Sequence, residues 1–227
     1  MKKELEALVD IISDVDVDIS FTFIEVGALQ IPEGNQNVDN EPFDNEPFYE
    51  LLKYYPSSRV IGFELDEDTC DSMNLSAGAG IKYYPHALGK ANEVRSLYIT
   101  QHPMCCSLYK PNDAFISLYQ EMQYSYLVSE TTVDTISLDF FLEKHKIGPV
   151  DFIKIDVQGA ELDVFKGGKE ALENVLKIVC EVEFVPMYKS QPLFGDICNF
   201  LDEYSLMFNK FLGMCGRTLK PILMGNN

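Results

Sequence analysis

The chain has 227 residues with 18 Lys and Arg against 36 Asp and Glu, so its formal net charge at pH 7 is −18 and its pI is near 4.4. Binding to nucleic acid needs a basic surface, and the longest basic cluster here is Lys2-Lys3, so we expect no nucleic-acid partner. An anionic membrane would repel the chain for the same reason. With 46% hydrophobic residues, the sequence fits a single domain over residues 1–227.

The cysteines and the N-terminus indicate the cellular compartment in which the protein is expected. Six cysteines are too few for a disulfide scaffold and form no C-x-x-C pair, which favours reduced thiols. The N-terminus lacks the apolar core and cleavage pattern of a signal peptide. No apolar run approaches the roughly 18 residues that a membrane-spanning helix needs. We therefore expect a cytoplasmic protein without a membrane partner, and we leave its oligomeric state open.

The first fifty residues predict a helix, a strand and a loop. Residues 1–18 have apolar side chains at i, i+3, i+4 and i+7, which indicates a helix, followed by an acidic link. Residues 21–26 are aromatic and β-branched and end at Gly27, as expected of a buried strand. Residues 30–47, rich in Pro and Asn, predict a long loop.

Strands and helices then alternate. Strands are predicted over 59–63 and 81–84, with a helix over 67–74 between them. This alternation predicts an α/β fold whose parallel sheet carries helices on both faces. The middle of the chain is less regular, with a strand predicted over 95–100, a loop over 102–113 and a tyrosine-rich helix over 114–127.

The C-terminal half resumes the alternation. Ser137 is a predicted N-cap for a helix over 138–145, and a central strand is expected over 152–156. Short helices, a buried strand over 177–184 and a helix containing Ile197 follow. The final apolar runs, 206–212 and 218–224, are joined by a short connection, which predicts an antiparallel hairpin at the sheet edge.

The predicted strand ends suggest a ligand site, because open α/β sheets bind ligands beyond the carboxyl ends of their strands. Gly27 lets a ligand approach the backbone, and Glu64 is placed to accept hydrogen bonds from two ribose hydroxyls. Together they suggest a nucleoside-containing cofactor. Separately, the glycine is equally explained by a plain turn and the glutamate by a helix cap. The fingerprint G-x-G-x-x-G is absent, which favours a cofactor without a pyrophosphate.

Several segments resemble the FkbM-type methyltransferases. The strongest are DFIKIDVQGAELDVFKGG over 151–168, EVEF over 181–184 and QPLF over 191–194. Residues 60–64, 87–89 and 135–139 also follow the family's order. The resemblance implies a Rossmann-like class I fold that binds S-adenosylmethionine, with a seven-stranded, mostly parallel sheet whose last strand is antiparallel. It also implies O-methylation of a small molecule or a sugar.

The resemblance also implies site residues. Residues 25–28 correspond to the first cofactor motif, although the family usually has D-x-G-A-N-x-G there, and Leu29 stands in place of Asn. Glu64 corresponds to the ribose-binding acid, and Asp156 lies beside the methionine moiety and the acceptor. The expected cofactor-binding residues are Glu25, Gly27, Ala28, Glu64, Leu65, His86, Ala87 and Asp156.

Methyl transfer to a hydroxyl needs a proton acceptor or a divalent cation. Asp156, Glu183 and His102 are the expected catalytic residues, and Glu161 is a further candidate base. Asp156, Glu181 and Glu183 also form a candidate Mg²⁺ site, since the two glutamates share one face of a predicted strand. The alternative is that one or both of Glu181 and Glu183 bond the N-terminus of a helix or pair with Lys154 or Lys189, and that His102 is a solvated loop residue.

The leading hypothesis is an S-adenosylmethionine-dependent O-methyltransferase of a small hydroxylated molecule or a sugar. The alternative is a cofactor-binding regulatory or catalytically inactive protein of the same fold, motivated by the altered first motif. A nicotinamide-dependent oxidoreductase would need the missing glycine fingerprint. The acids at the strand ends favour a cationic cofactor and a neutral acceptor over a polyanionic one.

Overall fold

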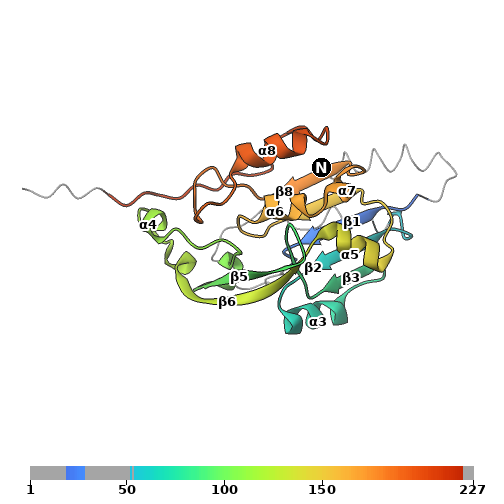
Figure 1. Ribbon diagram of the computed structural model, residues 1–227, viewed down its shortest axis with the longest axis horizontal. Helices are drawn as coiled ribbons and strands as arrows, with labels where there is room; N and C mark the ends of the chain where they lie inside the picture. The colour runs from blue at the N-terminus through green and yellow to red at the C-terminus, as the bar shows by residue number, and fades with distance from the viewer. Residues whose placement is uncertain (1–18, 29–51, 53, 222–227) are drawn as a thin grey trace, which may run out of the picture.

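The computed structural model describes residues 19–28, 52 and 54–221, and its centre is a five-stranded sheet (Figure 1). The strand order is β3-β2-β1-β7-β8, and every neighbouring pair is parallel. All five carboxyl ends therefore lie along one edge of the sheet. The strands are β1 Thr22–Val26, β2 Arg59–Phe63, β3 Ile81–Tyr84, β7 Phe152–Ile155 and β8 Lys177–Cys180.

Helices cover both faces of this sheet. One face carries α5 Leu138–His145, α6 Glu161–Lys166, α7 Lys169–Leu172 and α8 Phe194–Asp202. Their apolar side chains, among them Phe141 and Phe165, form the main core with alternate residues of β1, β2 and β7. On the other face, Cys70 of α3 Glu67–Ser76 packs against Tyr83. The predicted α/β architecture with helices on both faces is confirmed.

A second, three-stranded sheet extends from the central one as a long ribbon (Figure 1). Its order is β4-β6-β5, with β4 Ala87–Leu88 parallel to β6 Leu127–Ile136, and β5 Glu93–Thr100 antiparallel to β6. The connection between β5 and β6 contains three single-turn helices: η1 Pro103–Cys105, α4 Asp113–Ile116 and η2 Gln123–Ser125. The single seven-stranded sheet predicted from the sequence is therefore wrong, because the described residues form five strands in one sheet and three in another.

Several local predictions are confirmed. The predicted strands over 21–26, 59–63, 81–84 and 152–156 coincide closely with β1, β2, β3 and β7. Ser137 caps α5 as expected, since its Oγ accepts a hydrogen bond from the Phe140 N–H at 3.3 Å. The predicted strand over 95–100 is part of β5.

The predicted helix over 114–127 is wrong. Only α4 and η2 form there, and β6 already begins at Leu127. The short turns in this segment are not continued into a helix, because some of its backbone groups bond to distant segments. The Gln120 N–H donates to the Thr218 carbonyl at 2.8 Å, and the His102 N–H donates to the Tyr124 carbonyl at 2.9 Å.

The predicted C-terminal strands also need correction. The strand expected over 177–184 ends at Cys180, and beyond it the Glu183 carbonyl accepts from the Phe194 N–H at 3.0 Å. The expected terminal hairpin does not form within the described residues, since 206–212 contains no strand and Leu219 bridges to Tyr119. The predicted helix and link over 1–18 and the predicted loop over 30–47 lie outside the described residues, and the single domain over 1–227 stays a prediction.

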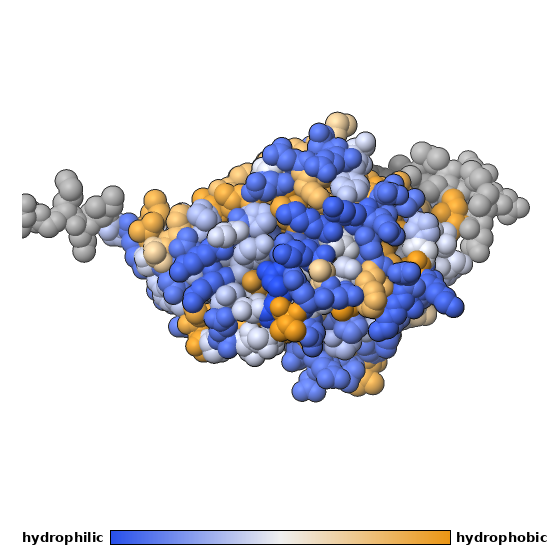
Figure 2. All heavy atoms as spheres, in the orientation of Figure 1, coloured by the Kyte–Doolittle hydropathy of each residue, from blue (hydrophilic) through white to orange (hydrophobic). Residues whose placement is uncertain are grey.

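The surface is consistent with the acidic composition. The face shown in Figure 2 is largely hydrophilic, with apolar residues scattered over it. Within the described part of the chain, no helix has both the length and the apolar character needed to cross a membrane.

Candidate functional site

The end of β1 turns sharply against β7. Gly27 has φ +76°, and a Cβ there would lie 1.8 Å from the carbonyl oxygen of Asp156, so only glycine fits. The N–H groups of Gly27 and Ala28 both donate to the Phe63 carbonyl at 3.1 Å. This turn holds the first expected cofactor motif against Asp156.

Glu25 precedes this turn on β1 and is only 4% exposed. Its neighbour in the strand register is Lys154 of β7, whose Nζ lies 3.4 Å from Glu25 Oε1. Lys154 was one expected partner for Glu181 and Glu183, and the structure pairs it with Glu25.

Glu64 follows β2, as expected of a ribose-binding acid. It is half-buried, and its Oε1 accepts a hydrogen bond from the Asp66 N–H at 2.9 Å. Burial raises the pKa of the Glu64 carboxyl, and the hydrogen bond from Asp66 partly offsets this effect. Leu65 beside it is 36% exposed. Glu64 therefore also shapes the turn into α3, which Asp66 caps by accepting from the Thr69 N–H.

His86 follows β3, and its ring lies against the α5 layer. The centroids of the His86 and Phe141 rings are 6.0 Å apart. Burial lowers the pKa of His86, and the nearby Lys144 and His145 lower it further, so the imidazole is neutral at neutral pH. The next residue, Ala87, pairs with Thr135 in the second sheet.

Four carboxylates gather where β7 and β8 end, and we call them the rim carboxylates: Asp156, Glu161, Glu181 and Glu183. Gln158 joins two of them, since its Nε2 donates to Asp156 Oδ1 at 2.9 Å and to Glu181 Oε2 at 2.6 Å. The Gln158 backbone is left-handed, with φ +55°. The amide thus bridges these two acids with hydrogen bonds.

Glu161 stabilises the turn over residues 156–159 with two hydrogen bonds. Its Oε1 accepts hydrogen bonds from the N–H groups of Val157 at 2.9 Å and Gly159 at 3.2 Å. Glu161 is 1% exposed at the start of α6. This carboxyl therefore has a structural role that the sequence reasoning did not assign to it.

Burial raises the pKa of three rim carboxylates. The pKa of Glu183 rises to about 7 and that of Glu161 to about 8, while that of Glu181 lies well above its ordinary value. After burial, the next cause for Glu181 is Asp156, and every charged neighbour that shifts its pKa is another rim carboxylate. In the described part of the chain, Glu183 Oε2 is buried and has no hydrogen-bond partner. These are the features of a proton-accepting site near neutral pH.

The connection between β5 and β6, which contains Cys105 and Ser107, lies over the turn formed by residues 156–159, and we call it the covering loop. The Ser107 hydroxyl donates to the Gln158 carbonyl at 2.6 Å. The Tyr188 hydroxyl lies 3.2 Å from Gln158 Oε1 and 3.0 Å from the Cys105 carbonyl oxygen. Gln158, Tyr188 and Gln191 are site residues that the sequence reasoning missed, although Gln158 and Gln191 lie within the segments that resemble the FkbM family.

His102 lies in this covering loop, where it caps η1. Its Nδ1 accepts from the Met104 N–H at 3.3 Å, and its ring centroid is 6.5 Å from that of Tyr124. Among the described contacts, His102 contacts only its own loop and Tyr124, and none of them joins it to the rim carboxylates. The loop is connected to the site through Cys105, whose carbonyl accepts from Tyr188.

The structure does not assemble the expected Mg²⁺ ligands. Within residues 19–28, 52 and 54–221, no three His, Cys, Asp or Glu side chains are grouped so as to hold a metal ion. Two features work against the expected set of Asp156, Glu181 and Glu183. The Gln158 amide lies between the first two, and β8 ends before Glu181, so the glutamates do not share a strand face.

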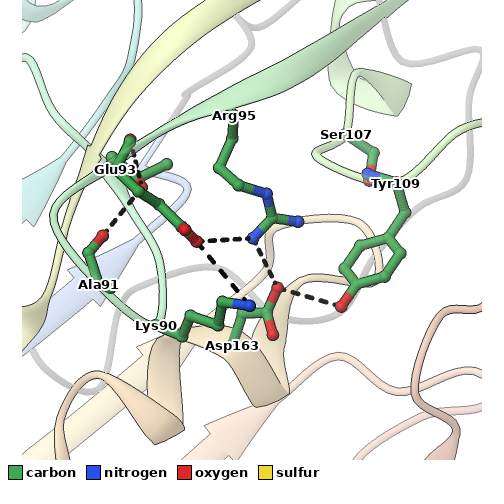
Figure 3. Close-up of polar contacts among 8 residues, drawn as sticks. Lys90, Ala91, Glu93, Arg95, Ser107, Tyr109 and Asp163 are labelled. Carbon is green, nitrogen blue, oxygen red and sulfur yellow. Dashed lines mark hydrogen bonds and ion pairs between the residues drawn. The ribbon is translucent and has the colours of Figure 1, made fainter.

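A second polar cluster fastens the covering loop to α6, and Figure 3 shows it. We call it the Arg95 network: Lys90, Glu93, Arg95, Tyr109 and Asp163. The Asp163 side chain on α6 is buried, and its Oδ2 accepts from Arg95 Nη1 at 3.1 Å and from the Tyr109 hydroxyl at 3.0 Å. Arg95 Nη1 is also 3.6 Å from Glu93 Oε1. The network thereby anchors the loop whose Ser107 bonds to Gln158.

The chain is similar in sequence to known methyltransferases. The chain is 33% identical over 92 residues to the 2-O-methyltransferase NoeI of Sinorhizobium fredii, covering 40% of this chain and 37% of that protein. It is 28% identical over 148 residues to Methyltransferase 1 of Beauveria bassiana, covering 58% of this chain and 59% of that protein. The chain thus spans less than two thirds of these relatives. No solved structure is significantly similar to it.

The family comparison covers most of the chain. The sequence model of the methyltransferase FkbM domain matches residues 25–206, which include the end of β1, the rim carboxylates and Gln191. The resemblance inferred from the segments over 151–168 and 181–184 is therefore confirmed. This chain belongs to the methyltransferase FkbM domain family.

Proposed function

We propose that this protein is an S-adenosylmethionine-dependent methyltransferase that methylates a hydroxyl group of a small neutral molecule or a sugar. Membership of the FkbM family supports methyl transfer, and the printed name of the rhizobial relative, a 2-O-methyltransferase, favours oxygen as the acceptor atom. The observation that carries the proposal is the half-buried Glu183 carboxyl group at the carboxyl edge of the sheet, whose Oε2 is buried and has no hydrogen-bond partner among the described residues.

The residues at this edge fit the cofactor. When bound, S-adenosylmethionine supplies an electrophilic methyl group on a positively charged sulfur. Its positive charge would favour the ionised form of the rim carboxylates, three of which have raised pKa values in its absence. Glu64 offers carboxylate oxygens for ribose hydroxyls. The turn at Gly27 packs the end of β1 against the Asp156 backbone, which holds the first cofactor motif beside Asp156.

Glu183 is the residue best suited to accept the acceptor's proton. With a pKa of about 7, a substantial fraction of this carboxyl is ionised at neutral pH, and it still binds a proton firmly. Asp156 and Glu181 remain linked through Gln158, which orients both. Holding the acceptor oxygen in line with the methyl group supplies most of the remaining acceleration.

Calorimetric titration with S-adenosylhomocysteine tests the cofactor half of the proposal. We expect binding, and we expect Glu64→Ala to weaken it by about tenfold or more through the lost ribose contacts. Glu67→Ala is the matched control, because Glu67 is exposed in the first turn of α3, and it should bind like the wild type. Absence of binding at millimolar ligand would refute the proposal.

Methyl transfer tests the acceptor half. Radiolabelled S-adenosylmethionine is incubated with the protein and a panel of methyl hexopyranosides and phenols, and labelled products are separated. We expect at least one neutral hydroxyl compound to be methylated. Cofactor binding without transfer to any compound would instead favour a regulatory or inactive protein.

A further inference from the structure

Four phenylalanine rings gather beyond the end of β8, and we call them the phenylalanine cluster: Phe184, Phe194, Phe208 and Phe211. The ring centroids of Phe208 and Phe211 are 4.7 Å apart, and those of Phe184 and Phe194 are 5.1 Å apart. Phe194 joins the two pairs, since its centroid is 5.4 Å from that of Phe208 and 5.5 Å from that of Phe211. The four rings therefore form one continuous apolar surface.

The phenylalanine cluster is exposed to solvent, unlike the rings of the core. Phe184 is 51% exposed, Phe208 53% and Phe211 42%, and Phe194 is half-buried. The ring of Phe141 in the main core is 0% exposed. Leaving apolar rings in water costs free energy. A contiguous apolar surface that stays exposed in a folded protein is typical of a binding site.

The chain segment that carries Phe208 and Phe211 is attached on both sides of them. Figure 1 shows this segment running from α8 toward α4. At the α8 end, the Leu206 N–H donates to the Leu201 carbonyl at 3.2 Å. At the other end, the Thr218 carbonyl accepts from the Gln120 N–H. The two rings are therefore presented by a segment that is anchored to the body of the protein.

The phenylalanine cluster is continuous with the candidate site. Phe184 directly follows Glu183, and the Phe194 N–H donates to the Glu183 carbonyl at 3.0 Å. Two of the four rings therefore come from backbone that is bonded to Glu183 itself. Consecutive Cα atoms are about 3.8 Å apart, so a molecule held at Glu183 needs an extension of only a few atoms to reach this surface.

We propose that the phenylalanine cluster binds an alkyl or aryl group of the methyl acceptor. The preferred acceptor is then a hydroxyl compound with an apolar substituent, and a free sugar is a poor one. This inference rests on the proposed function and names the class of acceptor. Phenylalanine side chains offer no hydrogen-bonding atom, so they favour an apolar group over a polar one.

Two other occupants fit the phenylalanine cluster less well. The net charge of −18 opposes seating on an anionic membrane. A second copy of the chain, or another protein, seated on the cluster would also lie against the Glu183 backbone. It would then obstruct the acceptor whose proton Glu183 is proposed to take.

An alkyl series tests the inference by kinetics. Methyl, butyl and octyl glycosides of the best methylated hexose are compared below their micelle concentrations, or para-alkyl phenols if a phenol is the better acceptor. Each buried CH₂ group contributes about fourfold, so burial of about three of them raises kcat/KM about 50-fold from the methyl to the octyl compound. Equal kcat/KM values along the series would overturn the inference and leave the proposed function standing, whereas no methyl transfer at all would refute the proposed function.

The double variant Phe208→Ser/Phe211→Ser localises the effect. Both side chains are exposed, so serine is compatible with the fold, and we expect the ratio of kcat/KM between octyl and methyl compounds to fall about tenfold or more. Leu75→Ser is the matched control, because Leu75 is a 90% exposed apolar residue on α3, and the ratio should stay at its wild-type value. An unchanged ratio in the double variant would overturn the inference. So would a wild-type dimer in sedimentation that the double variant dissociates, because a second copy would then cover the cluster.

Calorimetric titration keeps the inference testable without turnover. Octyl and methyl glucopyranoside are titrated into the full chain saturated with S-adenosylhomocysteine. We expect the octyl compound to bind the wild type about ten times or more tightly than the double variant, with a more negative heat-capacity change than the methyl compound gives. Equal affinities of the octyl compound for the wild type and the double variant would overturn the inference whether or not methyl transfer is seen.

Discussion

The rim carboxylates and the Arg95 network each contain buried or half-buried acids, but the surroundings of these acids are opposite. In the network, Asp163 accepts from the Arg95 guanidinium and the Tyr109 hydroxyl, so its charge is compensated. In the rim, the charged neighbours that raise the pKa of Glu181 are themselves acids. A compensated buried acid holds elements together, whereas a group of acids that raise one another's pKa marks a place for a ligand. The Arg95 network supports the rim carboxylates indirectly, because it anchors the loop whose Ser107 bonds to Gln158.

The largest expected effect is on activity in the rim. Glu183→Gln removes the proton acceptor while keeping the size of the side chain. We expect kcat for methyl transfer to fall about 100-fold or more, measured with the best acceptor of the panel. Glu203→Gln, at an exposed position after α8, is the control and should keep full activity. Near-normal activity in Glu183→Gln would show that another group accepts the proton.

In the Arg95 network, the expected effect is on stability. Arg95→Met leaves the buried Asp163 without its cation, so we expect the free energy of unfolding in urea to fall by about 2–3 kcal/mol. Adding Asp163→Asn removes the uncompensated charge and should recover part of this loss. A double variant that is less stable than Arg95→Met alone would contradict the role assigned to the pair.

The pH dependence of stability separates the two groups of acids. Burial raises the pKa of Glu183 from 4.5 to about 7, so the folded protein binds this proton more tightly than the unfolded chain does. The stabilisation from this proton is complete below the pKa that Glu183 has in the unfolded chain. It is lost as the pH rises through the pKa that Glu183 has in the folded protein. Relative to Glu183→Gln, the wild type should therefore lose about 1–2 kcal/mol between about pH 5 and about pH 8.

Urea unfolding of both proteins across this pH range measures the difference. Glu143→Gln, at an exposed position on α5, should run parallel to the wild type. A wild type that gains stability relative to Glu183→Gln as the pH rises would show that this carboxylate is compensated like Asp163.

The smallest expected effect is at the exposed end of the Arg95 network. Lys90 Nζ is 4.0 Å from Glu93 Oε1, and its side chain is 52% exposed. Water screens such a pair, so Lys90→Met should change the free energy of unfolding by less than about 0.5 kcal/mol. A loss as large as that of Arg95→Met would mean that the network acts as one unit and that burial of Asp163 is not the deciding factor.

The central sheet was predictable because its signal is local. A buried parallel strand is a short apolar run that ends at a glycine or an acid, and the segments that became β1, β2 and β7 have this form, while β3 is followed by Pro85. Glu64 and Asp156 follow β2 and β7 as expected. The tyrosine-rich segment over 114–127 misled the prediction because its backbone bonds to distant parts of the chain, which no local spacing reveals.

The site was predictable only in part. Asp156, Glu181 and Glu183 were expected at the strand ends, and they do gather there. The end of β8 at Cys180 places Glu181 and Glu183 in irregular backbone, so their expected arrangement on one strand face was wrong. Gln191 was not expected, since a glutamine gains meaning only from what it faces once it is buried.

The sequence by itself determined the alternation of strands and helices, the acids at the strand ends and the FkbM family. Only the tertiary structure decided which acids are compensated. Lys154 pairs with Glu25 across 129 residues of sequence, and Arg95 pairs with Asp163 across 68. The physical reason is that ion pairing depends on distances of a few ångströms between segments that lie far apart along the chain.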